Sequence, residues 1–265
     1  MSGKIFKKIR TQLRYLYRGK SNQELLQATD VFLVSYPRSG NTWCRTILTH
    51  LLYPDFELDK LSEIKKYIPG IHHPFPQHNN YSEPRVIKTH QAFYFRYGKK
   101  NNQLYRKNIY IVRNVLDVAK SFYQYKKVRG RIPDISMDEF AQKMVYGMYA
   151  PGSWQEHILG WYGASQFYGE VLFVRYEDME QDIVKEITRM ANFLGFPKSA
   201  AEYEAIALKS NIHQMRVAQE RGPLGKNSEM IRKGDKRLPE LSFSKDTIDL
   251  FMKFNREAMN LFGYV

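Results

Sequence analysis

A short apolar run that ends in a proline and leads directly into a helical pattern constrains the fold of this 265-residue chain more than any other feature. Residues 30–36 (DVFLVSY) predict a buried strand, because so short an apolar run is typical of a strand covered on both faces. Residues 37–41 predict a tight turn, and residues 42–53 place apolar side chains at helical intervals. A strand, a turn and a helix therefore follow one another without a spacer.

Strand and helix patterns alternate along the rest of the chain. Strands are predicted at 85–90, 108–114 and 170–176, and helices near 59–67 and at 115–127, 136–148, 153–168, 179–194, 199–209 and 244–262. Such alternation favours an α/β fold with a parallel sheet. We therefore expect a single domain over residues 1–265, a three-layer fold with a central parallel sheet flanked by helices. The carboxyl ends of its strands share one edge, where ligands bind in such folds.

Cysteine and apolar content exclude several classes of protein. The chain has one cysteine, Cys44, which excludes an internal disulfide framework and a Cys-based zinc site. No apolar run reaches ~18 residues and residues 1–10 lack a signal-peptide pattern, so we expect no transmembrane helix and a cytoplasmic location. His72, His73 and His78 lie close in sequence without a carboxylate spaced as a fellow ligand. We therefore expect no metal site.

The formal net charge of +14 is concentrated in two blocks. Residues 1–20 contain seven Lys and Arg and no acid, while residues 85–131 contain thirteen and a single acid. Basic blocks predict an anionic partner, such as nucleic acid, a membrane surface or a phosphorylated small molecule, or else a solvated face. Residues 1–20 also space apolar side chains helically, which predicts a basic amphipathic helix or tail that could touch a membrane.

The turn after the first strand has the character of an anion site. Residues 35–43 read SYPRSGNTW, and a strand–turn–helix junction of this kind points backbone N–H groups and a helix N-terminus outward. Arg38 adds a charge, and Ser39 and Thr42 add hydroxyl donors. The G-x-x-x-x-G-K-[ST] pattern of nucleoside triphosphate sites is missing, which favours a single phosphate and disfavours a P-loop kinase.

Three further segments place reactive or basic residues near the same edge. Lys88 and His90 end the second predicted strand, and their spacing puts both side chains on one face, as a general base with a charge stabiliser beside it. Arg113 ends the third predicted strand, eight residues before Ser121. The polar stretch 217–242, which we expect to form a C-terminal lid loop, contains Arg232-Lys-Gly234, a sequence suited to a phosphate clamp.

In this order and at these spacings, the four segments resemble the PAPS-dependent cytosolic sulfotransferase family, of which we expect this chain to be a bacterial-type member. Residues 152–157 (GSWQEH), Trp161 and residues 174–179 (VRYEDM) extend the resemblance, which runs from about residue 30 to residue 263. It implies that a sulfonyl group moves from 3′-phosphoadenylyl sulfate (PAPS) to a hydroxyl or amine of a small alcohol, phenol or amine. Adenosine 3′,5′-bisphosphate (PAP) is then released, and no metal is needed.

The resemblance also implies residue roles. His90 corresponds to the catalytic base, and Lys88 and Arg38 to residues that stabilise charge on the transferred group and the leaving phosphate. A P-loop-like strand–loop–helix would hold the 5′-phosphosulfate. The implied donor-binding residues are Arg38, Ser39, Gly40, Asn41, Thr42, Trp43, Arg113, Ser121, Tyr176, Ile212, Arg232, Lys233 and Gly234.

Four departures from the family pattern accompany these matches. Arg38 stands where the family has Lys, Asn41 where it has Thr, and Ile212 where it often has an aromatic residue over the adenine. Residues 235–239 replace the Gly-Asp-Trp that commonly follows Arg-Lys-Gly.

Other functions stay open at this point. The basic charge and nineteen tyrosines permit a protein that binds a polyanion, either nucleic acid or a membrane surface. Because the basic residues cluster with His90 at one predicted sheet edge, we expect no specific nucleic-acid partner. A sulfotransferase acting on glycans is a further alternative. Segments 54–84, 91–107 and 123–134 flank His90 and Ser121, so we expect them to line the acceptor site. The acceptor itself, the choice between O- and N-sulfation, and the oligomeric state do not follow from the sequence.

Overall fold

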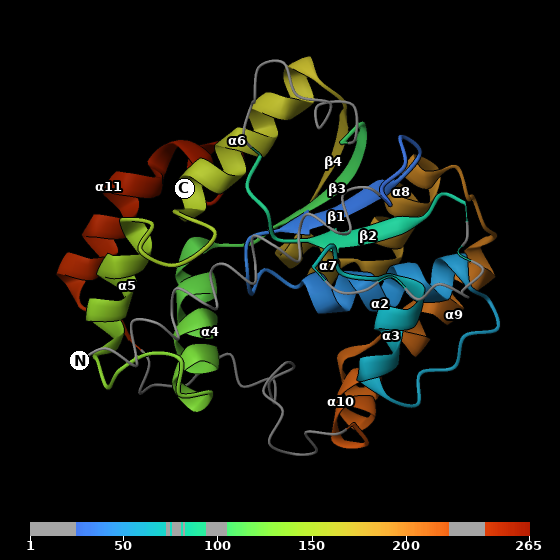
Figure 1. Cartoon of the computed structure of the whole chain (residues 1–265), viewed down its shortest axis with the longest axis horizontal. Helices are drawn as coiled ribbons and strands as arrows, with labels where there is room; N and C mark the ends of the chain where they lie inside the picture. The colour runs from blue at the N-terminus through green and yellow to red at the C-terminus, as the bar shows by residue number, and fades with distance from the viewer. Residues whose placement is uncertain (1–24, 73–74, 76–80, 82, 94–104, 223–241) are drawn as a thin grey trace.

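A computed structural model describes residues 25–72, 75, 81, 83–93, 105–222 and 242–265 of the chain (Figure 1). The basic segment 1–20 lies outside these residues. So do Arg232, Lys233 and Gly234 and most of the predicted lid.

The core of the fold is a sheet of four parallel strands in the order β2-β1-β3-β4. Its strands are β1 (Val31–Ser35), β2 (Val86–Thr89), β3 (Lys107–Val112) and β4 (Glu170–Arg175). Leu33 of β1 pairs with Lys88 on one side and with Ile109 on the other. Because every neighbour is parallel, the four carboxyl ends meet at one edge, which confirms the predicted architecture.

Helices cover both faces of this sheet (Figure 1). Alternating residues of β1 divide between two cores, with Phe32 and Val34 in one and Val31 and Leu33 in the other. The first core includes residues of α4 (Val115–Val128), α5 (Met137–Val145), α6 (Trp154–Phe167) and α11 (Lys245–Leu261). The second includes residues of α2 (Asn41–Leu52), α7 (Tyr176–Gln181), α8 (Ile183–Leu194) and α9 (Ala200–Lys209).

A third, smaller cluster joins α10 (Ile212–Glu220) to the connection that follows α2. That connection contains the short helices η1 (Leu61–Glu63) and α3 (Ile64–Tyr67), where a short helix was predicted. Ala218 of α10 is buried against Phe56 and Leu61. The predicted start of the lid at residue 217 was therefore wrong, because α10 continues to Glu220 and packs its apolar side chains there.

The predicted helix 179–194 is divided in two. Asp182 lies between α7 and α8 with a non-helical backbone (φ −147°, ψ 84°), and its side chain accepts a hydrogen bond from the Lys185 N–H at 3.0 Å. An aspartate that caps the N-terminus of a helix stabilises a new start there. The apolar spacing runs through the break, which is why the sequence pattern predicted one helix.

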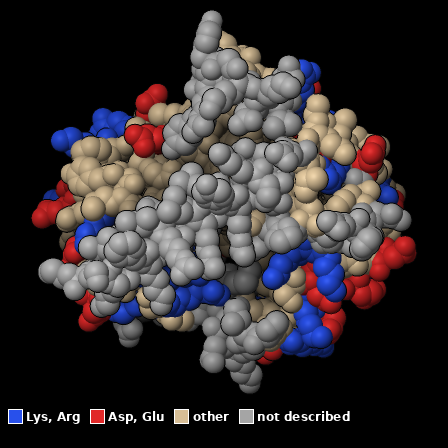
Figure 2. Space-filling view, viewed as in Figure 1, with Lys and Arg blue, Asp and Glu red and all other residues tan. Residues whose placement is uncertain are grey.

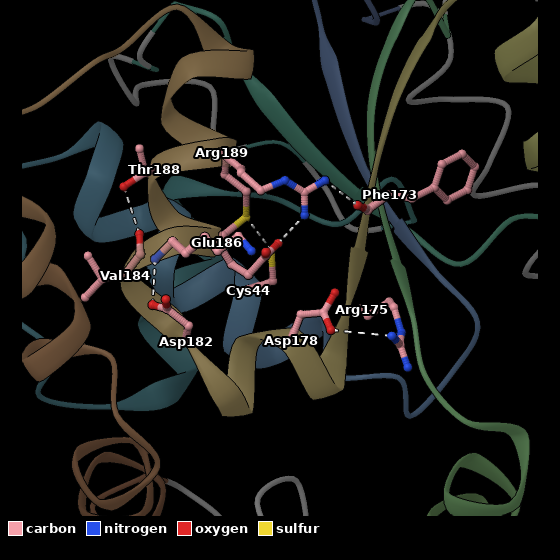
Figure 3. A network of polar contacts seen from close by, with 11 residues as sticks. Cys44, Phe173, Arg175, Asp178, Asp182, Val184, Glu186, Thr188 and Arg189 are labelled. Atoms are coloured by element: carbon pink, nitrogen blue, oxygen red, sulfur yellow. Dashed lines mark hydrogen bonds and ion pairs between the residues drawn. The ribbon is translucent and has the colours of Figure 1, made fainter. Parts of the chain in front are cut away.

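Polar contacts hold α8 against both α2 and the sheet (Figure 3). Buried Glu186 pairs with Arg189 at 2.6 Å, and Arg189 also donates to the carbonyl oxygen of Phe173 in β4. The Cys44 sulfur of α2 lies 3.4 Å from the Met190 sulfur. Burial raises the pKa of the Cys44 thiol far above its usual range, so this cysteine is a packing residue.

Two kinds of feature do not occur in the described part of the chain. No helix there is long and apolar enough to cross a membrane. No group of three His, Cys, Asp or Glu side chains gathers there in a way that could hold a metal ion.

Candidate active site

The loop between β1 and α2 has a backbone suited to an anion. Arg38 (φ 74°) and Gly40 (φ 97°) both adopt left-handed conformations, which fold the loop tightly over the start of α2. Successive N–H groups in such a loop form a concave anion site, and the first N–H groups of the helix have no acceptor within it. A Cβ at residue 40 would overlap the ring of Tyr176, so the loop needs glycine there for space as well as for conformation.

Two buried donors beside this loop have no partner among the described residues. They are the hydroxyl of Ser39 and the Nε of Arg113, at the carboxyl end of β3. The Arg113 guanidinium lies 3.9 Å above the Tyr176 ring, which fixes its plane. Buried polar groups are nearly always hydrogen-bonded, so this pair of unsatisfied donors fits an anionic ligand such as phosphate.

An aromatic pair borders the same loop. The rings of Trp43 and Tyr176 lie 5.5 Å apart at 69°, and the indole N–H of Trp43 donates to the Ser210 carbonyl at 3.0 Å. Ile212 follows two residues later as the exposed first residue of α10. The structure therefore brings the rings of Trp43 and Tyr176 together. Trp43 is also hydrogen-bonded to Ser210, which lies two residues before Ile212 in the chain.

His90 lies directly after β2 with one ring nitrogen held. Its Nδ1 is 2.7 Å from the Ser35 carbonyl oxygen, which can only accept, so Nδ1 carries the proton. The Ser35 hydroxyl accepts a hydrogen bond from Asn41 and lies 3.2 Å from the same nitrogen. Burial, then the charge of Lys88, lowers the pKa of His90 well below its usual value. The imidazole is therefore neutral, with the lone pair on Nε2.

Two residues of α6 hold the segment that carries His90. The Nε2 of His157 donates to the His90 carbonyl at 3.2 Å, and the hydroxyl of Tyr110 lies 2.7 Å from the other ring nitrogen. Burial lowers the pKa of His157 to about 4, which keeps it neutral. Trp161 donates to the carbonyl of Gln91 at 3.0 Å. His157 and Trp161, both in stretches singled out in the sequence, thus hold the segment that carries the predicted base.

Lys88 shares its surroundings with a second cation. It is half-buried, and burial, followed by the charge of Arg45, lowers its pKa to about 7. Arg45 belongs to α2 and donates to the carbonyl of Ile68, in the segment that pairs with Lys88 along the edge of β2. Burial lowers the pKa of Arg45 to about 9. No sequence pattern pointed to Arg45.

Arg38 links the loop to α4. Its Nε donates to the Ser121 hydroxyl at 3.0 Å, its guanidinium lies 4.8 Å from the centre of the Tyr125 ring, and its charge contributes to the lowered pKa of His90. The predicted convergence of the loop, the second strand and the helix after the third strand is therefore present in the structure.

One candidate residue is oriented differently from the expectation. The Asn41 side chain points inward to Ser35, so only its backbone N–H is left for a ligand of the loop. Sequence reasoning also missed Ser35, which reads as an ordinary buried strand residue and yet holds His90 through its carbonyl.

Comparison with known proteins shows that most of the chain matches a single protein family. The model of the sulfotransferase domain matches residues 28–263. Human sulfotransferase 1E1 is 30% identical over 210 residues, which cover 74% of this chain and 69% of that protein. Rat sulfotransferase 1 family member D1 is 32% identical over 178 residues, covering 62% of this chain and 58% of that protein. The chain thus aligns with less than two thirds of the length of the rat relative.

A solved structure shares the architecture. Mouse sulfotransferase SULT7A1, complexed with PAP, superposes with a TM-score of 0.66 at 24% identity, over 88% of this chain and 85% of that one. At 24% identity, this similarity shows that the two proteins share a fold.

Proposed function

Because this chain belongs to the sulfotransferase domain family, we propose that it transfers a sulfonyl group from PAPS to a hydroxyl or amine of a small-molecule acceptor. The donor supplies the sulfonyl group and leaves as PAP. The neutral His90, tied at Nδ1 and placed beside the Arg38 loop, is the observation that carries this proposal.

His90 acts as the general base. Its Nδ1–H stays on the Ser35 carbonyl, so Nε2 takes the proton of the acceptor hydroxyl or amine as the new bond to sulfur forms. His157 and Trp161 keep the segment in place through their hydrogen bonds to His90 and Gln91. The lowered pKa of His90 keeps the base unprotonated at neutral pH.

Cationic side chains provide the charge that the donor requires. Arg38 and Lys88 stabilise negative charge on the transferred group and the leaving phosphate. The Ser39 hydroxyl, the Thr42 hydroxyl and the N–H groups at residues 40–42 hold the 5′-phosphate. Arg113 and Ser121 hold the 3′-phosphate, and Arg232, Lys233 and Gly234 bind the same phosphate. Trp43, Tyr176 and Ile212 line the adenine site.

The proposal also covers the metal requirement of the reaction and the cellular location of the protein. Arg38 and Arg113, with Lys88 where the bound donor keeps it protonated, supply positive charge at the site, so the transfer is proposed to need no metal ion. The single buried cysteine suits a reducing compartment, which favours the cytoplasm.

Replacing His90 tests this function. His90→Ala should lower turnover of PAPS with a pool of small alcohols, phenols and amines by about 10²-fold or more, since a general base contributes ~10²–10⁴. Its affinity for PAP should stay within a few-fold. His213→Gln, at an exposed histidine of α10, is the matched control and should keep its turnover. Near-complete turnover by His90→Ala would overturn the assignment of the base.

A further inference from the structure

Three guanidinium groups converge on one tyrosine of α4. The guanidinium carbons of Arg38 and Arg129 each lie 4.8 Å from the centre of the Tyr125 ring, and that of Arg131 lies 5.6 Å from it. Tyr125 is half-buried, Arg129 is half-buried at the end of the helix, and Arg131 is exposed. On the face shown in Figure 2, Lys and Arg side chains lie around the lower end of α4.

The charges of Arg129 and Arg131 are not balanced by a carboxylate within the described part of the chain. No ion pair there joins Arg129 or Arg131 to a carboxylate, whereas the neighbouring Lys127 lies 3.7 Å from Asp134. Lys126 belongs to the same group, and burial, followed by the charge of Arg131, lowers its pKa. Two neighbouring guanidinium groups without a counter-charge, as at Arg129 and Arg131, favour an anion from outside the chain.

The phosphates of the donor do not account for Arg129 and Arg131. Among the described groups proposed to hold the 3′-phosphate, Arg113 lies before α4 and Ser121 lies in the middle of it. Arg129 is eight residues beyond Ser121, which places it about 12 Å further along the helix. Tyr125 lies between the two, one turn from Ser121, and touches the same Arg38 that bonds Ser121 and acts on His90.

We propose that Arg129 and Arg131 bind an anionic group of the acceptor, a carboxylate or a phosphate. The apolar part of the acceptor lies along Tyr125, and its hydroxyl or amine reaches His90. This assignment rests on the proposed function and narrows it to acceptors that carry a negative charge at the end away from the sulfonated atom. Arg forms paired hydrogen bonds with both carboxylate and phosphate, so the two chemistries share one site.

Matched pairs of phenols test the proposal by calorimetric titration of the protein, with and without saturating PAP. One pair is 4-hydroxyphenylacetate and its amide, and the other is 4-hydroxybenzylphosphonate and its diethyl ester. The anionic member of at least one pair should bind at least about tenfold more tightly than its neutral partner. One charge-assisted hydrogen bond contributes about this much to affinity. Equal binding within both pairs, or no binding of either anion, overturns the proposal.

Variants on one helix separate this site from general basic charge. The double variant Arg129→Gln, Arg131→Gln should abolish the preference for the anionic member. The control Lys127→Gln removes a positive charge that is paired with Asp134, and it should keep the preference. A preference that survives the double variant, or inorganic phosphate that competes as well as the phosphonate, overturns the proposal. Failure of PAP to bind would contradict the proposed donor instead, and the titrations without PAP would still report on the anion site.

Discussion

The Nε of Arg38 lies 3.0 Å from the hydroxyl of Ser121, although 83 residues separate them in the chain. This hydrogen bond joins the loop after β1 to α4, and therefore the proposed sites of the 5′- and 3′-phosphates. Arg38 reaches Ser121 from a left-handed backbone (φ 74°) that non-glycine residues seldom adopt. The structure thus places the Arg38 guanidinium between the loop proposed to hold the 5′-phosphate and the helix proposed to hold the 3′-phosphate.

Removing the charge of Arg38 should slow transfer. Arg38→Met keeps much of the length of the side chain and loses the donors, so we expect turnover to fall by ~10²–10³. Arg38→Lys retains the charge without the planar fork and should lose much less. Steady-state release of PAP from PAPS measures both. Equal losses in the two variants would show that the charge of residue 38 does not matter for transfer.

Affinity for PAP should fall as the pH rises above about 7. The pKa of Lys88 is lowered to about 7, so the lysine is charged below that pH and increasingly neutral above it in the free protein. A bound phosphate favours the charged form and raises this pKa, so each step upward in pH costs affinity. His90 does not add to the effect, because it is already neutral. Calorimetry from about pH 7 upward avoids the titration of phosphate itself, near 6.

Arg45 supplies the matched variant for this pH dependence. Arg45→Met removes the charge that helps to lower the Lys88 pKa, so the decline in affinity should begin at a higher pH. Burial lowers the Lys88 pKa more than the charge of Arg45 does, so the variant should restore only part of the usual lysine pKa. An identical pH profile in the variant would show that Arg45 does not act on Lys88.

Gly40→Ala should destabilise the fold and weaken PAP binding together. A left-handed alanine costs about 1–2 kcal/mol, and the added Cβ would also overlap Tyr176. Gly195→Ala is the control, since Gly195 has a similar φ of 79° with open space around it. Denaturant unfolding should therefore show a larger loss for residue 40 than for residue 195. Equal losses would mean that the contact with Tyr176 relaxes without cost.

Local patterns predicted most of the fold. The four strands are short apolar runs, and their boundaries agree with the sequence within two residues. The break at Asp182 was missed because the apolar side chains keep their spacing through it. The polar composition of residues 217–242 predicts a loop for residues 217–220 as well. Their place in α10 depends on packing of Ala218 against Phe56, a contact from a distant part of the chain.

The candidate site was predictable only in its residue types. His90 and Lys88 follow from the strand end, and Arg38 from the loop. The partners that tune them do not, because the Ser35 carbonyl and Arg45 act through three-dimensional contacts that leave no pattern in the sequence. The inward turn of Asn41 has the same origin, since its partner Ser35 lies on the preceding strand.

The most direct test of the central claim is a calorimetric titration of PAP without metal, with AMP and ATP as controls. We predict binding at micromolar or lower Kd for PAP and much weaker binding for the other two nucleotides, because separate sites are proposed to hold its 3′- and 5′-phosphates. Equal affinity for all three nucleotides would contradict the account, and the basic residues of the site would then point to a polyanion partner.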